Sequence, residues 1–277
     1  MKALAGLLCV CFAMLLLSAA VGHRGQATEQ GYEPALRPAQ GQRTPVVVEL
    51  FTSEGCSSCP PADALLARLD KIQPVPGAEV IALKQHVDYW NHLGWRDPYS
   101  SEQFSTRQEG YARAFGNNGL YTPQMIVDGQ TEFVGSHESR ARQAIAQAAR
   151  SPKAAVHLAW ASNPEAGNAI PLEVRVEKLE GAIAGDTAEV FLAVTESNLH
   201  SEISSGENAG RKLDHAAVVR TLERIGIADP QAAAFAARPI IEISPGWKRE
   251  NLRAVVFVQG SRSRRMLAAA STPFSQQ

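Results

Sequence analysis

Runs of apolar residues along the chain predict an ordered series of strands and helices that starts at residue 45. Residues 45–51 are almost continuously apolar and rich in β-branched side chains, which is typical of a strand buried on both faces of a sheet. Residues 62–72 place apolar side chains at helical spacing, residues 79–83 repeat the strand pattern, and residues 100–115 fit a helix. This alternation predicts parallel strands connected through helices, an α/β arrangement.

A strand led by proline and a hairpin follow. Residues 121–129 contain a Thr-Pro step, continue through an apolar stretch and end in Asp-Gly, a dipeptide that favours a hairpin turn. Residues 130–134 then return as the partner strand. Residues 136–150 form an Ala-rich helix, with Ser136 as its expected N-cap.

Short alternating runs, separated by turn residues, dominate the chain after residue 150. They predict an antiparallel, β-sandwich-like domain. The expected strands are residues 154–159, 172–179, 188–195, 217–222, 252–259 and 264–270. We therefore expect two domains, residues 45–150 and 151–277. Residues 206–210 form a loop whose purpose the sequence does not reveal.

The first 44 residues predict an export signal and a tether. Residues 1–20 combine a positive start, an apolar centre and small residues before a cleavage site. The run is also near the lower length limit of a spanning helix, so an uncleaved anchor is the alternative. Residues 21–44 are rich in Gly, Gln, Pro and Thr and indicate a flexible tether. We expect a periplasmic or secreted protein with no stable membrane insertion after signal cleavage.

The charge balance excludes some classes of partner. The net charge is −1, from 27 basic and 28 acidic residues. A generic nucleic-acid binder needs a basic excess to neutralise phosphates, so we expect no nucleic acid as partner. Attachment to anionic lipid by charge alone is disfavoured for the same reason.

The number and spacing of the cysteines indicate a chemical role for them more than a role as a structural crosslink. Cys9 and Cys11 lie in the export signal, so the mature chain keeps Cys56 and Cys59 in one C-x-x-C motif. A disulfide across so short a loop contributes only about 2 kcal/mol, against about 4.7 kcal/mol for a hundred-residue loop. The motif lies between a strand and a helix, where unpaired N–H groups and the helix dipole lower the pKa of a thiol. We expect this effect at Cys56.

The combination of strand, C-x-x-C, helix and Thr-Pro strand resembles the thioredoxin superfamily. That resemblance implies a cis peptide bond between Thr122 and Pro123, facing the cysteines. The string VELFTSEGCSSCPPAD at residues 48–63, with HVDYW at residues 86–90, is similar to the bacterial family DUF1223, whose function is not established. The similarity extends over residues 206–220. The fold class we expect is thus a thioredoxin-like N-terminal domain followed by the β-rich domain.

Two further features place candidate residues near the motif. Pro60 and Pro61 lack N–H groups and are tolerated only in the first helical turn, so the helix should start at or after Cys59. Glu49 is a carboxylate within an apolar strand, and the thioredoxin resemblance makes it a candidate buried acid for the resolving thiol. Its spacing differs by one residue from the usual pattern, which puts it on the other face unless the turn absorbs the offset.

A polar and aromatic cluster follows the second parallel strand. Ligands bind beyond the carboxyl ends of strands in doubly wound sheets, so His86 and Trp90 are candidates for binding substrate or, for His86, for tuning the thiolate. A loop of packed aromatic residues is the alternative. A metal site from His86, Asp88 and the cysteines is less favoured, because Pro123 would obstruct it.

We expect an exported thiol–disulfide oxidoreductase that acts on protein or small-molecule disulfides. Cys56, usually the more exposed cysteine of such a pair, exchanges with the substrate, and Cys59 resolves the mixed disulfide. Thr122 and Pro123 offer backbone to the substrate, and no dissociable cofactor is needed. The alternative is a non-catalytic binding module for envelope assembly or copper delivery, with structural zinc or an inert cysteine pair as weaker options.

Overall fold

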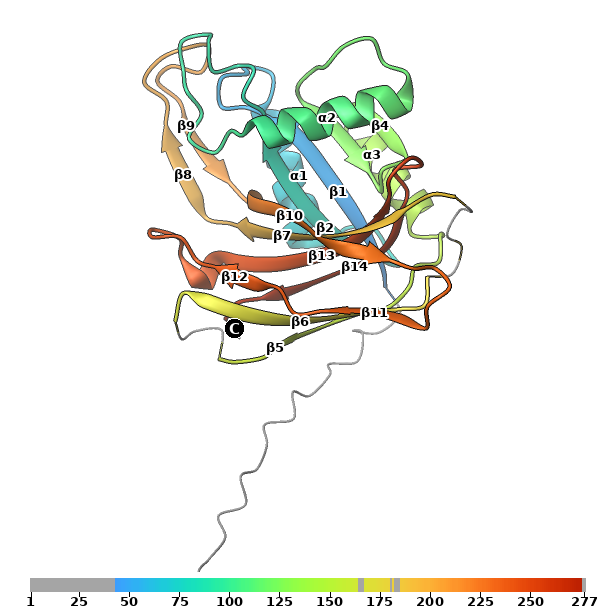
Figure 1. Cartoon of the computed structure of the whole chain (residues 1–277). Helices are drawn as coiled ribbons and strands as arrows, with labels where there is room; N and C mark the ends of the chain where they lie inside the picture. Colours follow the sequence, from blue (N-terminus) through green and yellow to red (C-terminus); the bar gives the residue numbers. More distant parts are fainter. Residues whose placement is uncertain (1–42, 164–166, 180, 182–184, 276–277) are drawn as a thin grey trace, which may run out of the picture. The chain divides into compact units, whose positions relative to one another are not determined.

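An eight-stranded sheet organises the part of the chain that the computed structural model describes, residues 43–163, 167–179, 181 and 185–275. In order across the sheet, its strands are β14 (Met266–Pro273), β13 (Leu252–Gly260), β7 (Ala188–Glu196), β10 (Val218–Ala228), β2 (Ala78–His86), β1 (Thr44–Thr52), β3 (Gln124–Val127) and β4 (Thr131–Val134). The strands β1 and β2 are parallel, as the sequence predicts, and β3 runs antiparallel to β1. Figure 1 shows this arrangement.

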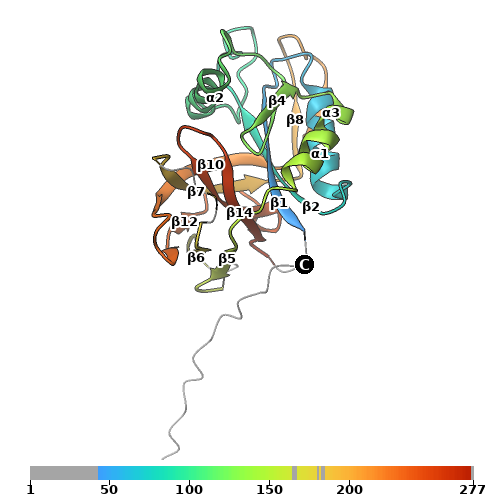
Figure 2. The ribbon, with the colours of Figure 1, turned by 90° about the vertical axis from the view of Figure 1, so that its right-hand side faces the viewer.

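The strand β1 is buried on both faces because helices cover it from two sides. Val48 and Leu50 pack against α1 (Pro60–Ile72) and α3 (Glu138–Ala148), whereas Val47 belongs to the core on the opposite face. That opposite face also receives Phe104 of α2 (Glu102–Phe115). Figure 2 shows α2 on one side of β1, and α1 with α3 on the other. The apolar run at residues 45–51 therefore reflects two separate cores.

The helix starts follow the expected chemistry in two of three cases. Cys59 is the N-cap of α1 and the two prolines occupy its first positions, which confirms the start expected from the sequence. Ser101 caps α2 by accepting a hydrogen bond from the Gln103 N–H group. The prediction of Ser136 as N-cap of α3 is wrong, because the helix begins at Glu138 and His137 occupies the cap without a side-chain hydrogen bond.

A smaller four-stranded sheet packs against the strands β7, β13 and β14 of the large sheet. Its strands are β5 (Val156–Trp160), β6 (Ala169–Glu177), β11 (Ala234–Ala237) and β12 (Ile240–Glu242). Alternate side chains of β6 are buried, and they join residues of β7, β13 and β14 in one core. A short 3-10 helix, Arg249–Asn251, precedes β13. The two layers therefore face each other across one hydrophobic core.

Strands from both predicted domains meet in the large sheet. The strand β10 lies parallel to β2, with Val218 opposite Lys84, and the Lys84 N–H group donates to the Ala217 carbonyl. The sheet therefore continues across the predicted boundary at residue 150. A separate two-stranded hairpin, β8 (Leu199–Glu202) and β9 (Lys212–His215), completes the described strands, and the sequence analysis did not predict it.

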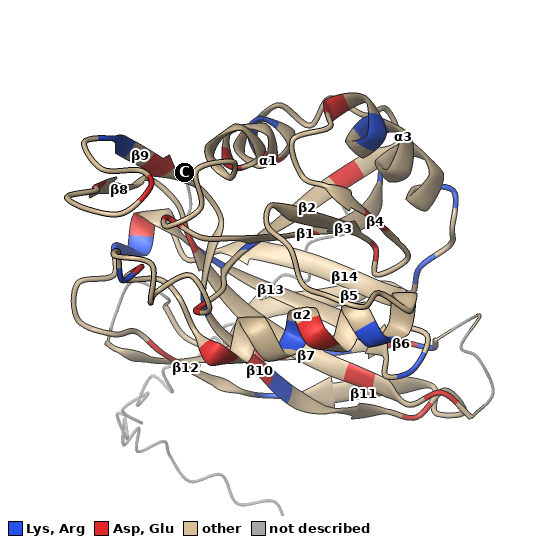
Figure 3. Cartoon of the chain, turned by 90° about the horizontal axis from the view of Figure 1, so that it is seen from above, with Lys and Arg blue, Asp and Glu red and all other residues tan. Residues whose placement is uncertain are grey.

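The predicted export signal, tether, Cys9 and Cys11 lie outside the described residues. Within the described ranges, no helix has the length and apolar character needed to cross a bilayer. Figure 3 shows Lys and Arg interspersed with Asp and Glu over the elements.

Candidate functional site

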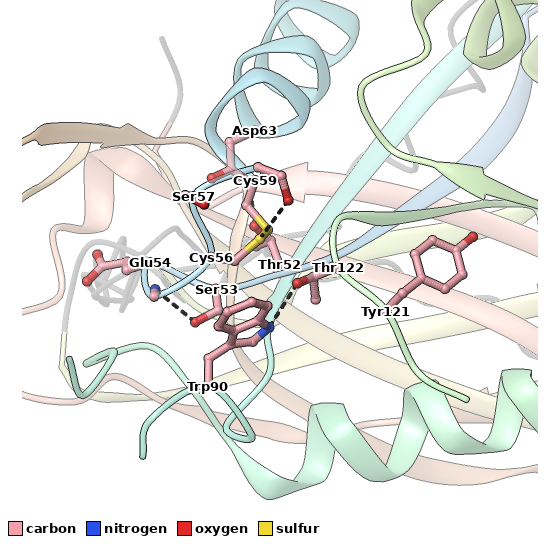
Figure 4. The surroundings of a disulfide bond; sticks show 12 residues. Thr52, Ser53, Glu54, Cys56, Ser57, Cys59, Asp63, Trp90, Tyr121 and Thr122 are labelled. Carbon is pink, nitrogen blue, oxygen red and sulfur yellow. Dashed lines mark hydrogen bonds between the residues drawn. A yellow bond between two sulfur atoms is a disulfide. The ribbon is translucent and has the colours of Figure 1, made fainter. Parts of the chain in front are cut away.

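The turn between β1 and α1 carries Cys56 and Cys59, which are joined as a disulfide with Cα atoms 5.4 Å apart. Backbone hydrogen bonds close the turn, from the Cys56 N–H to the Ser53 carbonyl (3.1 Å) and from the Cys59 N–H to the Cys56 carbonyl (3.2 Å). The Cys59 carbonyl accepts from the N–H groups of Ala62 and Asp63, which starts the helix. Figure 4 shows the disulfide at the end of α1. The cysteines thus lie at the helix start that their spacing predicts.

Neither cysteine reaches the surface. Both residues are 0% exposed, whereas Ser57 and Ser58 between them are exposed. The expectation that Cys56 is the more exposed cysteine is therefore wrong for this structure. The Ser58 hydroxyl lies 3.4 Å from Cys56 Sγ, and the remaining cover comes from distant segments. A reactant must displace some of this cover to reach either sulfur.

The loop between β8 and β9 covers the turn from one direction. The Asn208 side-chain amide donates to the carbonyls of Glu54 (2.7 Å) and Cys56 (3.0 Å). The Ser57 N–H group donates to a carboxylate oxygen of Glu207 at 3.1 Å. These contacts assign a place to residues 206–210, the loop for which the sequence analysis had no purpose.

Trp90 covers the turn from another direction. Its indole N–H donates to the Thr122 hydroxyl at 2.9 Å, and its Cβ lies 3.3 Å from where a Cβ on Gly55 would be. Figure 4 shows the indole beside the disulfide. The peptide bond between Thr122 and Pro123 is cis, which confirms the prediction made for it. The structure thus brings two of the predicted site residues, Trp90 and Thr122, to the motif, and Pro123 follows Thr122 through the cis bond.

Buried charged side chains connect the residues that flank the two cysteines in sequence. Lys84, which is 1% exposed, places its Nζ atom 3.1 Å from Asp63 Oδ2 and 2.6 Å from His215 Nδ1. The other ring nitrogen of His215 lies 2.9 Å from Glu54 Oε1. The Trp95 indole N–H donates to the second oxygen of Glu54 at 2.7 Å. A continuous polar chain thus links the start of α1, the strand β2 and the hairpin β8–β9.

The hydrogen bonds assign the form of His215. The Lys84 ammonium has only donors, so His215 Nδ1 must accept and Nε2 must carry the proton donated to Glu54. This is the neutral ring. Burial, together with the positive charge of Lys84, lowers the pKa of His215 below its ordinary value despite the hydrogen bond to Glu54. Burial by itself raises the pKa of Glu54, but the hydrogen bonds from His215, Ser201 and Trp95 together lower the pKa below its ordinary value.

His86 belongs to the same buried region and does not line a surface. It is 0% exposed, and its Nδ1 atom lies 2.6 Å from Asp97 Oδ2. Burial alone raises the pKa of Asp97, but the interaction with His86 and the backbone hydrogen bonds from Glu54 and Tyr99 together lower it. The Glu54 N–H group donates to the same Asp97 oxygen at 2.8 Å. His86 therefore supports the turn before the cysteines through Asp97 and touches no surface groove.

Glu49 is held on the α2 side of the sheet. Arg107 contacts it through two nitrogen atoms, at 2.6 and 2.9 Å, and Tyr111 and Gln85 also donate to it. Burial raises the pKa of Glu49, but the charge and hydrogen bonds of Arg107 lower it overall. Its side chain faces away from α1, as the one-residue offset in spacing predicted, and no hydrogen bond among the described residues joins it to a cysteine.

The sequence alone does not point to the acids and bases that approach the motif. These residues are Glu54, Asp63, Lys84 and His215. Lys84 had a usable signal, since a lysine inside an apolar strand must find a buried partner. His215 had none, because its role depends on a hairpin from far along the chain. Among the described residues, no group of three or more His, Cys, Asp or Glu side chains is arranged to hold a metal ion.

Comparison with protein families assigns the chain to a group. The family model described as "Protein of unknown function (DUF1223)" matches residues 47–259, which include both the cysteine turn and the hairpin β8–β9. The chain belongs to DUF1223. No curated protein matches it.

Two solved structures are similar to this DUF1223 protein. The crystal structure of protein AGR_C_4864 from Agrobacterium tumefaciens has a TM-score of 0.65 and 26% identity, covering 86% of this chain and 98% of the other. HBP35 of Porphyromonas gingivalis has a TM-score of 0.60 and 15% identity, covering 85% of this chain and 76% of the other. The second likeness concerns the fold alone.

Proposed function

We propose that this protein is an exported thiol–disulfide oxidoreductase that acts through Cys56 and Cys59. The observation that carries the proposal is the disulfide between these residues at the first turn of α1. Such a position favours the thiolate that forms when the bond opens, because the positive end of the helix dipole lies at this turn. A disulfide across so short a loop contributes little to stability as a crosslink.

The arrangement of elements supports a thioredoxin-like domain over residues 45–150. The order β1, α1, β2, α2, β3, β4 and α3, with β3 antiparallel to β1, is the one expected for that superfamily. The neighbouring Thr122–Pro123 step agrees with it. We propose residues 151–277 as a β-rich C-terminal domain that shares the large sheet.

The proposed reaction is an exchange of two electrons. A substrate thiolate attacks Cys56 Sγ, the bond to Cys59 breaks, and the electron pair leaves with the Cys59 sulfur, which takes up a proton. A second substrate thiolate then attacks the substrate sulfur of the mixed disulfide, which releases Cys56 and the oxidised substrate. The reverse sequence reduces a disulfide. The protein needs no dissociable cofactor for either direction.

The partners we propose are proteins or small molecules that carry thiols or disulfides, in the periplasm or outside the cell. The export signal at residues 1–20 motivates the location. Thr122 and Pro123 lie beside the indole that covers the motif, and Thr122 would offer its backbone to an extended substrate.

Single-cysteine variants test the proposed function. Incubated with glutathione disulfide, the Cys59→Ser variant should trap a mixed disulfide on Cys56, because the resolving thiol is missing. The Cys56→Ser variant is the matched control and should trap far less on Cys59. Peptide-level mass spectrometry separates these sites from Cys9 and Cys11. Failure of both variants to react while folded would contradict the proposal.

A non-catalytic binding module is the second candidate, and the complete burial of both cysteines favours it. Its role would lie in envelope assembly or in copper delivery. In copper delivery, thiolates and a histidine would bind the metal. Metal analysis of the protein purified under reducing conditions distinguishes the two candidates. Stoichiometric copper that departs after alkylation of Cys56 and Cys59 supports delivery.

A further inference from the structure

Two side chains of one loop hold a single peptide bond of the redox motif from both ends. The carbonyl of Cys56 accepts from the Asn208 amide at 3.0 Å, and the N–H of Ser57 donates to Glu207 at 3.1 Å. Both groups belong to the peptide bond that joins Cys56 to Ser57. Asn208 is 0% exposed although it lies in a loop, whereas Glu207 is exposed.

The loop is built to reach this position. Gly206 and Gly210 have φ angles of 77° and 79°, in the left-handed region that favours glycine. The Gly210 N–H group donates to the Ile203 carbonyl at 2.7 Å, which closes the loop on itself. The hydroxyl of Ser205 donates to the Gly94 carbonyl at 2.6 Å. The loop therefore rests on the segment after β2 and reaches the cysteine turn with its tip.

We propose that residues 205–210 form a lid over the Cys56–Cys59 pair, with Asn208 and Glu207 as the positioning residues that hold it shut. This inference rests on the proposed function. Disulfide exchange requires a thiolate to approach a sulfur in line with the bond that breaks. Because both cysteines are fully buried, part of their cover must move before exchange begins, and the lid is the part that moves. The rate at which thiols react with this pair is then set by lid opening as well as by sulfur chemistry.

Asn208 makes the larger contribution because it satisfies two carbonyls at once, those of Glu54 and Cys56. When Asn208 is shortened, the closed lid leaves both carbonyls buried without this donor, whereas the open lid lets water reach them. The open form is then favoured. The Glu207 carboxylate is ionised at neutral pH, since hydrogen bonds from Ser57 lower its pKa. This charged carboxylate accepts a hydrogen bond from the Ser57 N–H group, which is the second interaction that holds the lid closed.

The test measures the rate at which dithiothreitol reduces the Cys56–Cys59 disulfide in the folded, full chain. Samples are quenched with an alkylating agent, and the Cys56–Cys59 peptide is quantified by mass spectrometry. We expect Asn208→Ala to react about tenfold faster than the unmodified protein, because two hydrogen bonds of the closed state are lost. Glu207→Ala should react several-fold faster, and its exposed position leaves folding intact.

Matched controls separate the lid from general loosening. Asn251→Ala removes an asparagine that accepts from Asn198 far from the motif, and Glu202→Ala removes an exposed carboxylate of the same hairpin. Both should react at the unmodified rate. If the lid variants react at the same rate as the controls while the disulfide of the unmodified protein is readily reduced, the lid proposal is wrong and the proposed function stands. A disulfide that resists dithiothreitol in every folded variant would overturn both.

Discussion

At the scale of single residues, the site depends on buried charged and polar side chains that compensate one another's charge. Lys84 faces Asp63, and His215 connects Lys84 to Glu54. Removing one member of such a set leaves another charge buried without compensation, which costs several kcal/mol. The neutral form of His215 is essential to this balance, because a proton on Nδ1 would face the Lys84 ammonium at 2.6 Å.

The depressed pKa of His215 predicts a loss of stability on mild acidification. In the unfolded chain this ring takes a proton as the pH falls below about 6.5, whereas burial and Lys84 keep it neutral in the fold. The unfolded state then binds more protons, so the free energy of unfolding falls with pH by up to about 1.4 kcal/mol per unit. The loss begins below about 6.5 and continues until the folded pKa is reached.

Urea unfolding between pH 7.5 and 5 measures this effect. His215→Gln should flatten the slope in that window, because the titrating ring is gone. His200→Gln is the matched control, since His200 is an exposed partner of Asp214 on the same hairpin. Equal slopes for the unmodified chain and His215→Gln would show that His215 is not the group responsible.

At the scale of elements, the helix α1 approaches the hairpin β3–β4 so closely that a side chain at one position would force its neighbours to shift. A Cβ on Gly135 would lie 2.7 Å from the Leu50 Cδ1 atom and 3.1 Å from the Ala62 Cβ atom. Gly135 also donates its N–H group to the Pro123 carbonyl at 2.9 Å, which fixes the proline beside the helix. The close approach therefore positions the cysteine-bearing helix against the proline loop.

Gly135→Ala should destabilise the fold by about 1–3 kcal/mol, the usual cost of inserting volume into a packed region. The reason is contact with Leu50 and Ala62, since the backbone of Gly135 is not in the left-handed region. Chemical denaturation measures the change. Gly119→Ala is the matched control, because nothing lies within 4 Å of its added Cβ. A loss of stability in Gly135→Ala no larger than that in Gly119→Ala would contradict the close packing.

The sequence predicts the local elements well and the long-range contacts poorly. The strand at residues 45–51, the start of α1 at the double proline and the Asp-Gly hairpin each follow from neighbouring residues. The hairpin β8–β9 escapes prediction because its strands are only four residues each and carry mixed polarity. Its contributions to the site, Asn208 and His215, could not be anticipated without it.

At the scale of the whole molecule, the C-terminal strands complete the half that carries the cysteines. The strand β10 pairs with β2 where Val218 lies opposite Lys84, and Val219, Val255 and Phe257 share a core with Val47. The lid and His215 come from the same region. The two predicted domains are thus coupled through a sheet, a core and the cover of the candidate site.

A chain cut after residue 150 should therefore fail to fold cooperatively. It would expose β2 as an edge strand, uncover the core around Val47, and leave Lys84 and Glu54 without His215. Circular dichroism during thermal unfolding measures this, with residues 34–277 as the matched control. A sharp transition in the shortened chain would show instead that residues 45–150 are an autonomous domain.

The distance along the chain between the cysteines and their lid has a consequence for biosynthesis. Glu207 follows Ser57 by 150 positions, and ribosomes make the N-terminal part first. Both thiols therefore emerge before the residues that will shut them in. During that interval any oxidant or partner can reach them, and closure happens only when the last strands have joined the sheet. The pair can therefore react freely during synthesis, whereas in the finished protein its reactions require the lid to open.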